Sequence, residues 1–280
     1  MTADGWTQVV RQQIGLGRLL PLGGPGDGAW VTEAAARGAL RRALDTRSGV
    51  RLGALRIAAA SPVTSDDAPG TAREPAVVAP PGAVPPGPLR ITAELAATLH
   101  TPLPVTVAGV RTALAAAAGS LGLAVTEVDL RVTGVLAPDH PDGAANGGHP
   151  DGDGPEKRPA DGRAESGAGT GPRAGDDAGT DGAPGDEPDG EAGRLGAVAA
   201  AVPGVTRLTG ALGGRAAPVR IAEHPGDGDA AALPRRHVRV ELALSVAAGP
   251  PAVVRAVRRA VTDAAPDRPT VAVLVTALDP

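Results

Sequence analysis

Two stretches decide the fold: LRITAELAATL at residues 89–99 and VRVELALSV at residues 238–246. In both, apolar residues alternate with polar or small ones, and successive side chains of a β-strand point to opposite faces of a sheet. Each stretch therefore predicts a strand with one buried face and one face toward solvent. A helical pattern and a second apolar strand follow each time, so the same strand–helix–strand unit occurs twice, at residues 89–135 and 238–278.

A helix is expected between the two strands of each unit, because apolar residues there recur on one face. In the first unit this apolar stripe consists of Val107, Val110, Leu114, Ala117 and Leu121. In the second unit it consists of Val253, Val254, Val257 and Val261, with Arg255, Arg258 and Arg259 on the opposite side. Proline stands at the start of both helices, at Pro104 and Pro250, where its missing N–H costs little.

A further helix and strand precede each unit. Thr32 is placed to cap a helix that runs to about Leu44, and a strand begins near Leu55. Farther along the chain, a short helix near residues 197–202 precedes a strand at residues 219–222. The order helix, strand, strand, helix, strand predicts an α+β fold of two tandem small modules, each a roughly three-stranded sheet with helices on one face.

The region between the two modules has the composition of a disordered linker. Residues 138–193 contain no Val, Ile, Leu, Met or aromatic residue, and they hold 14 Asp or Glu against 4 Lys or Arg, a net charge of −10. Such a segment cannot bury enough apolar surface to offset the entropy lost on ordering. Because the whole chain carries −4, the remaining residues carry +6.

These features predict the following organisation. Residues 1–28 form an N-terminal amphipathic segment, residues 29–137 the first module, residues 138–193 the disordered acidic linker, and residues 194–280 the second module. Within the first module, a Pro-rich insertion is expected at residues 61–87.

The composition limits what the protein can be. Trp6 and Trp30 are the only aromatic residues, so both cores must be built from aliphatic side chains. The chain contains no cysteine, which excludes disulfides and thiolate sites. No apolar run reaches the roughly 18–20 residues of a membrane span, and the N-terminus does not resemble a signal peptide. We therefore expect a cytoplasmic protein whose membrane association, if any, is peripheral or through a partner.

Reactive side chains are sparse. Three carboxylates, Glu94, Glu127 and Asp129, are expected on the polar face of the first sheet, where paired acids could perform acid–base chemistry. Arg90 and Arg131 are expected on the same face, which favours a charge-paired, solvated surface. We expect no metal site, no cofactor and no catalytic residue.

Two surfaces are candidates for contact with a partner or a membrane. The N-terminal segment is apolar with interspersed arginines, so it could lie on a membrane or dock into a groove; the alternative is that it packs on the core of the first module. The arginines of the second helix could meet an acidic partner, anionic lipid or the linker; the alternative is a plain solvated face. The candidate contact residues are Trp6, Val10, Ile14, Leu19, Arg255, Arg258 and Arg259.

Two stretches resemble the alkaline shock protein family, whose members are also described as envelope stress response proteins. Residues 121–132, LGLAVTEVDLRV, are similar to the family's closing strand, a Gly-Leu step followed by alternating Val with Glu or Asn. Residues 202–205, VPGV, and the strands that follow are similar to its opening motif and paired strands. The resemblance covers about residues 30–135, without the Pro-rich insertion, and residues 194–278.

The chain also departs from the family pattern. Residues 247–249, AAG, stand where the family has an aromatic-Gly step, and residues 266–269, PDRP, replace the Gly-Leu step after the second helix. The resemblance therefore indicates a diverged, internally duplicated relative of actinobacterial type. It implies a non-enzymatic scaffold or adaptor of the envelope stress response at the cytoplasmic face of the membrane, held by a small membrane-anchor partner and capable of self-association.

Two other functions stay open from the residues. One is a nucleic-acid-binding module, although a charge of +6 spread over both modules is a weak basis for it, and no nucleic acid partner is expected. The other is an enzyme that uses the carboxylates of the polar sheet face.

Overall fold

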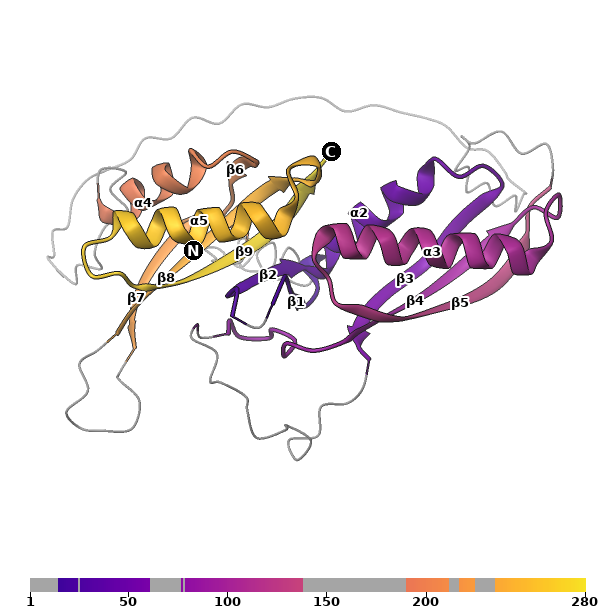
Figure 1. Cartoon of the computed structure of the whole chain (residues 1–280), viewed down its shortest axis with the longest axis horizontal. Helices are drawn as coiled ribbons and strands as arrows, with labels where there is room; N and C mark the ends of the chain where they lie inside the picture. Colours follow the sequence, from indigo (N-terminus) through magenta and orange to yellow (C-terminus); the bar gives the residue numbers. More distant parts are fainter. Residues whose placement is uncertain are drawn as a thin grey trace, which may run out of the picture. The chain divides into compact units, whose positions relative to one another are not determined.

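The computed structural model describes residues 15–24, 26–60, 77, 79–137, 190–211, 217–224 and 235–280 (Figure 1). These residues form an α+β structure with four α-helices and two sheets. Both sheets belong to one unit of the chain. The expected α+β class is therefore confirmed.

The first sheet has three strands, as expected. They are β3 (Val50–Ala59), β4 (Leu89–Ala97) and β5 (Val125–Val135), in the order β3-β4-β5. Strand β3 pairs antiparallel with β4, and β5 pairs parallel with β4. The helices of this part are α2 (Glu33–Asp45) and α3 (Leu103–Leu121). Because α3 connects two parallel strands, it must cross back over the face of the sheet.

The alternation predicted burial correctly within β4, which ends at Ala97; Leu99, the last residue of the predicted strand, is 63% exposed. Leu89, Ile91, Ala93, Leu95 and Ala97 are all buried, whereas the residues between them are more exposed. The predicted helix cap is also confirmed, because Thr32 precedes α2 and its Oγ1 accepts a hydrogen bond of 3.3 Å from Ala35 N.

The second sheet is larger than expected, with six strands. Four come from the C-terminal part: β6 (Val205–Leu208), β7 (Val219–His224), β8 (Arg235–Ser245) and β9 (Thr270–Asp279). Two come from near the N-terminus: β1 (Leu19–Pro21) and β2 (Ala29–Thr32). The order is β1-β2-β9-β8-β6, with β7 also paired to β8. The helices here are α4 (Glu191–Ala200) and α5 (Pro250–Ala264), with a short 3-10 turn (Val246–Ala248) before α5.

The expectation of three strands in the second sheet was wrong because β6 pairs with β8, and because β2, which also pairs with β1, joins the sheet at β9. Strand β2 runs parallel to β9, with Trp30 opposite Leu274 and Val31 opposite Val275. Residues 271–275 of β9 are buried without interruption, a pattern typical of a strand covered on both faces. Leu19, Trp30 and Val77 form a separate apolar cluster with Ala272 and Leu274. The N-terminal strands thus cover β9 along its edge and on one of its faces.

Two further expectations need correction. The polar side of β8 was expected to face solvent, but Glu241 is only 1% exposed and Ala243 is fully buried. Helix α4 begins at Glu191, inside the predicted linker and earlier than the expected start near residue 197. An acid in its first turn suits the N-terminal end of a helix dipole. The rest of the predicted linker, residues 138–189, lies outside the described residues.

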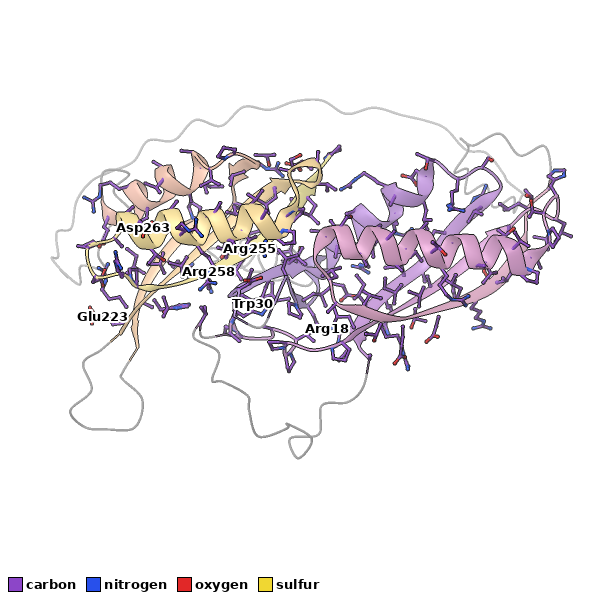
Figure 2. All side chains as sticks on the ribbon, in the orientation of Figure 1. Arg18, Trp30, Glu223, Arg255, Arg258 and Asp263 are labelled. Carbon is purple, nitrogen blue, oxygen red and sulfur yellow. The ribbon has the colours of Figure 1, made fainter. Side chains whose placement is uncertain are left out.

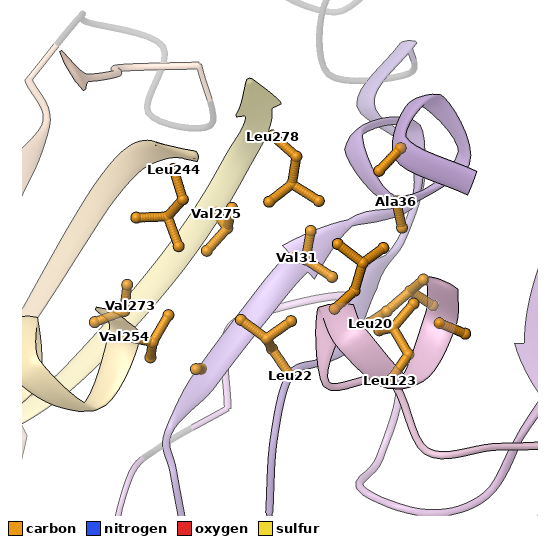
Figure 3. Packing of buried hydrophobic residues seen from close by; sticks show 14 of the residues in the cluster. Leu20, Leu22, Val31, Ala36, Leu123, Leu244, Val254, Val273, Val275 and Leu278 are labelled. Atoms are coloured by element: carbon orange, nitrogen blue, oxygen red, sulfur yellow. The ribbon is translucent and has the colours of Figure 1, made fainter. Parts of the chain in front are cut away.

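One apolar cluster runs through both sheets. It contains residues of β4, β5 and α3 together with residues of β8, β9 and α5, and β1 and β2 connect the two groups. Leu20 and Val31 lie between Leu123 at the end of α3 and Val275 of β9 (Figure 3). The two halves of the chain therefore share a core.

The two sheets have the same strand register. Ile91 lies opposite Val128 in the β4–β5 pair, and Val238 lies opposite Val271 in the β8–β9 pair. From these two starting points, the partners advance one residue at a time in both strand pairs. Each pair then shifts register after the same number of residues, which is after Leu95 in the first sheet and after Leu242 in the second. Residues 128–135 of β5 therefore correspond to residues 271–278 of β9.

Candidate functional site

The edges of the sheets are the places where this fold offers unpaired backbone groups to a partner. The second sheet ends in short strands, of three residues in β1, four in β6 and six in β7. The first sheet ends in two long strands, of ten residues in β3 and eleven in β5. Only the long strands offer more than a few groups for pairing.

Side chains already form hydrogen bonds with backbone groups at the edge of β3. Glu33 Oε1 accepts a hydrogen bond of 3.4 Å from Ile57 N, and Arg18 Nη2 donates one of 2.9 Å to Ile57 O. Arg41 Nη2 donates a third, of 2.6 Å, to Gly53 O. The register of β3 is also interrupted between Leu52 and Leu55. An incoming strand would have to displace these contacts, so β3 is a poor template.

The edge of β5 is open by comparison. Among the described residues, no strand pairs with β5 except β4. Within the described part of the chain, the side chain that reaches the outer backbone groups of β5 is Arg111, whose Nε donates a hydrogen bond of 3.2 Å to Val128 O. Two large apolar side chains of β5 are exposed, Val132 at 37% and Val135 at 61%. These properties make β5 the candidate interaction edge of the described structure.

The corresponding edge of β9 is occupied. Strand β2 pairs with residues 273–275 of β9, which correspond to residues 130–132 of β5. In the part of the chain that the structure describes, this stretch of the strand is thus covered in the second sheet and uncovered in the first. The sequences agree with this difference, since β9 has Ala272 and Leu274 where β5 has Asp129 and Arg131.

An ion-pair network lies on the polar face beside the β5 edge. Arg90 Nε donates a hydrogen bond of 2.6 Å to Glu127 Oε2 and lies 3.4 Å from Asp129 Oδ2. The hydrogen bond to Glu127 raises the pKa of the Arg90 guanidinium above its ordinary value. Glu94, the third of the predicted carboxylates, lies in register with Arg131. The predicted carboxylates therefore share the face with the predicted arginines, as expected for a charge-paired surface.

The N-terminal contact candidates divide into two groups. Trp6, Val10 and Ile14 lie outside the described residues. Leu19 is buried in β1, in the apolar cluster that also holds Trp30 and Leu274. Its side chain is used within the fold.

Two of the three predicted arginines of α5 make contacts within the fold (Figure 2). Arg258 Nη1 donates a hydrogen bond of 2.9 Å to Gly26 O, and its Nε donates one of 3.1 Å to Val271 O. Burial lowers the pKa of this guanidinium from its ordinary value. Arg255 Nη1 lies 3.5 Å from Asp27 Oδ2, and Arg259 is exposed. Arg255 and Arg258 thus fasten the turn between β1 and β2 to α5.

An ion pair between a partly buried arginine and a buried carboxylate on the second sheet was not expected from the sequence. Arg239 Nη2 lies 3.4 Å from Glu241 Oε1, and Glu241 is in register with Leu274 of β9. The alternation of β8 had placed both side chains on a face toward solvent. The apolar residues at matching positions of β9 were the available signal that this face is covered.

One helix, α3, is long and apolar enough among the described helices to cross a membrane by length and composition. Its buried residues Val110, Leu114, Ala118 and Leu121 all belong to the common core. These four residues pack α3 on the first sheet, while 17% of its most apolar stretch is buried within the fold.

No family model matches this chain, and no curated protein or solved structure matches it either. The resemblance to alkaline shock proteins therefore stays a prediction, which rests on residues 121–132 and 202–205.

Proposed function

We propose that the chain is a non-enzymatic scaffold or adaptor protein and that the edge of β5 is its binding element. The observation that supports the proposal is a difference between two corresponding strands. Strand β9 is paired with β2, whereas β5, a strand of eleven residues, lies at the edge of its sheet among the described residues. Strand addition to such an edge is a common mode of peptide recognition, in which the backbone supplies affinity and exposed side chains supply specificity.

We also infer that the two modules arose as copies of one unit. The residues of β4 and β5 pair in the same register as those of β8 and β9, and both pairs have a register shift at the corresponding position. This agreement supports the inference. A fold whose second copy accepts a strand at β9 is suited to accept one at β5. Residues 138–190 contain no Val, Ile, Leu, Met or aromatic residue, so they lack the larger apolar side chains with which β2 covers β9. This composition favours a partner from outside the module.

The place of action that we propose is the cytoplasmic face of the cell membrane, in the envelope stress response. This part of the proposal rests on the family resemblance, which also implies a small membrane-anchor protein as partner. Its test is fractionation of the tagged protein, at native expression level, into cytosol and membrane under resting and stress conditions. A protein found only in the cytosol under both conditions would contradict the envelope location.

The structure sharpens this experiment with two kinds of variant. A chain that begins at Gly15 removes Trp6, Val10 and Ile14 and keeps β1, so a loss of membrane association would assign it to the N-terminal segment. Val135→Lys adds charge to the β5 edge, so a loss of association would assign it to that edge. The matched control is Val105→Lys on α3, because Val105 is 60% exposed and Val135 is 61% exposed.

A further inference from the structure

We propose that the occupant of the β5 edge is β5 of a second copy of this chain, paired antiparallel about a twofold axis at Leu130. This inference rests on the proposed function, since it names the partner of the same edge. Such a pair would join the two three-stranded sheets into one continuous six-stranded sheet. The register follows from three properties of β5: the direction of its backbone groups, the order of its charges and the limits of its regular part.

The outward backbone groups of β5 are those of alternate residues. In a parallel pair, the N–H and C=O of one residue point to the same side, and those of the next point to the other side. Arg111 marks the outer side, because its side chain reaches Val128 O. Leu130 and Val132 must then also direct their backbone groups outward. In an antiparallel pair centred on Leu130, these three residues become the hydrogen-bonded positions.

Several antiparallel registers would keep the apolar side chains of both copies on the same face of the joined sheet. Among these registers, the charges of β5 favour the one centred on Leu130. With Leu130 on the axis, Asp129 lies opposite Arg131 of the second copy, and the symmetry produces this pair twice. A shift by one residue along each strand would place Asp129 opposite Asp129, or Arg131 opposite Arg131, and like charges directly opposite each other are unfavourable. The first of these shifts would also place Glu127 opposite Arg131, but Glu127 is already the hydrogen-bond partner of Arg90. Asp129 is 61% exposed in its side chain, and Arg131 is exposed.

The apolar side chains agree with the same register. Val128 lies opposite Val132 of the second copy, and Leu130 lies opposite Leu130, all on the face that α3 covers. Positions 129 and 131 are non-hydrogen-bonded, where side chains approach most closely, at a Cα separation of about 4.5 Å. The pairing would therefore bury the exposed side chain of Val132 and satisfy the charge of Arg131.

The neighbouring helix leaves room for the second copy. Arg111 lies on the side of α3 that is next to the β5 edge, since it reaches the backbone of that edge. The exposed residues one or two turns away on this side have short side chains: Pro104, Ala108, Ala115 and Gly119. A second α3, related by the twofold axis, can approach a face of this kind.

The length of the pairing is limited at both ends. The register between β4 and β5 shifts next to Leu89 and again after Leu95, so the regular part of β5 runs from about residue 127 to residue 132. Irregularities of this kind also occur in edges that are protected against pairing. The segment needed for the proposed register, residues 128–132, fits within the regular part. It includes residues 130–132, which correspond to the part of β9 that β2 covers.

The first test is sedimentation of the purified full chain over a range of concentrations. We expect a reversible monomer–dimer equilibrium for the unaltered chain. Arg131→Glu and Asp129→Arg should each weaken dimerisation at least tenfold, and the double variant should recover it, because the swap restores opposite charges in this register only. Arg56→Glu, at an exposed position of β3, is the control and should leave the dimer unchanged. A monomer at all concentrations, or no recovery in the double variant, would overturn the proposal.

The second test reads the register directly, and the absence of native cysteine makes it specific. Asp129→Cys and Arg131→Cys chains are mixed under mild oxidation. We expect a disulfide between the two different chains. In the mixed dimer, the cysteine at position 129 of one chain lies opposite the cysteine at position 131 of the other, and the second such position keeps its Asp129–Arg131 pair. Each variant alone should cross-link much less, and equal cross-linking in all samples would contradict the register.

The two proposals can fail separately. If the chain sediments as a monomer but Val135→Lys still releases it from the membrane, self-pairing is wrong and the edge binds another protein. If the chain dimerises as described but fractionates only with the cytosol, self-pairing stands and the envelope location is wrong.

Discussion

Val132 of β5 and Val275 of β9 occupy corresponding positions, yet Val132 is 37% exposed and Val275 is fully buried. Val31 of β2 lies opposite Val275, whereas among the described residues no strand lies beside β5 at Val132. The strand β2 therefore covers this position in one sheet and has no described equivalent in the other.

Truncation of the two valines should separate these roles. Val275→Ala removes buried methyl groups and leaves a cavity, so we expect it to lower the free energy of unfolding by about 1.5–3 kcal/mol. Val132→Ala should cost less than about 1 kcal/mol in the monomer, because its side chain already contacts water. Urea unfolding at low protein concentration, followed by circular dichroism, measures both. Equal losses would contradict the assignment of β5 as an open edge.

Two arginines of α5, Arg258 and Arg259, allow a second comparison of a buried contact with an exposed position. Arg258→Ala removes two hydrogen bonds from a charged donor to the carbonyls of Gly26 and Val271. We expect a loss of about 1–3 kcal/mol in the free energy of unfolding. Arg259→Ala, at an exposed position on the same helix, should change stability by no more than about 0.5 kcal/mol. If Arg258→Ala is as neutral as Arg259→Ala, the turn between β1 and β2 is not held by this side chain.

A glycine at the end of α3 is a third test. Gly122 has φ +80°, and a Cβ atom there would collide with the ring of Pro251 at the start of α5. Gly122→Ala should therefore destabilise the fold, by about 1 kcal/mol for the left-handed backbone and more for the collision. Gly119→Ala is the control, since a Cβ there meets nothing within 4 Å and alanine favours a helix. Thermal unfolding should show a lower Tm for the first variant and an equal or higher one for the second.

The local structure of the chain could be predicted well from the sequence. The alternation in β4, the stripe of α5 and the cap at Thr32 depend on residues close together in the chain, and all three are present. The pairing of β2 with β9 joins residues 29–31 to residues 273–275, and no local pattern fixes such a contact. The available signal was the uninterrupted apolar run at residues 271–275, which indicates burial on both faces.

The candidate edge was harder to predict than the strands themselves. Whether a strand lies at an edge depends on which other strands join the sheet, and that is decided by contacts distant in sequence. The sequence predicted β5 and its charges correctly, but the exposure of Val132 follows from the absence of a strand like β2 beside it among the described residues. The arginines of α5 were candidates for contact with a partner, and two of them, Arg255 and Arg258, contact the turn at Gly26 and Asp27 within the fold.

Acidification should weaken one specific contact at the end of β9. Thr206 Oγ1 and Arg207 Nη1 donate hydrogen bonds of 2.6 and 2.5 Å to Asp279 Oδ2, and these bonds hold the pKa of Asp279 below its ordinary value of 3.8. Because the folded pKa lies below the unfolded one, the contribution to stability is fully present above about pH 4. It is lost as the pH falls through the lowered pKa of the folded state.

The variant Asp279→Asn isolates this contribution. At pH 7 we expect it to be less stable than the unaltered chain by up to about 1 kcal/mol, a small value because Arg207 is mostly exposed and water screens the pair. The difference should shrink as the pH is lowered below about 4. Asp263→Asn, at an exposed position of α5, should match the unaltered chain at every pH. Urea unfolding of the three proteins between pH 7 and pH 3 measures these differences, and a difference for Asp279→Asn that does not change with pH would show that its carboxylate charge contributes nothing to the fold.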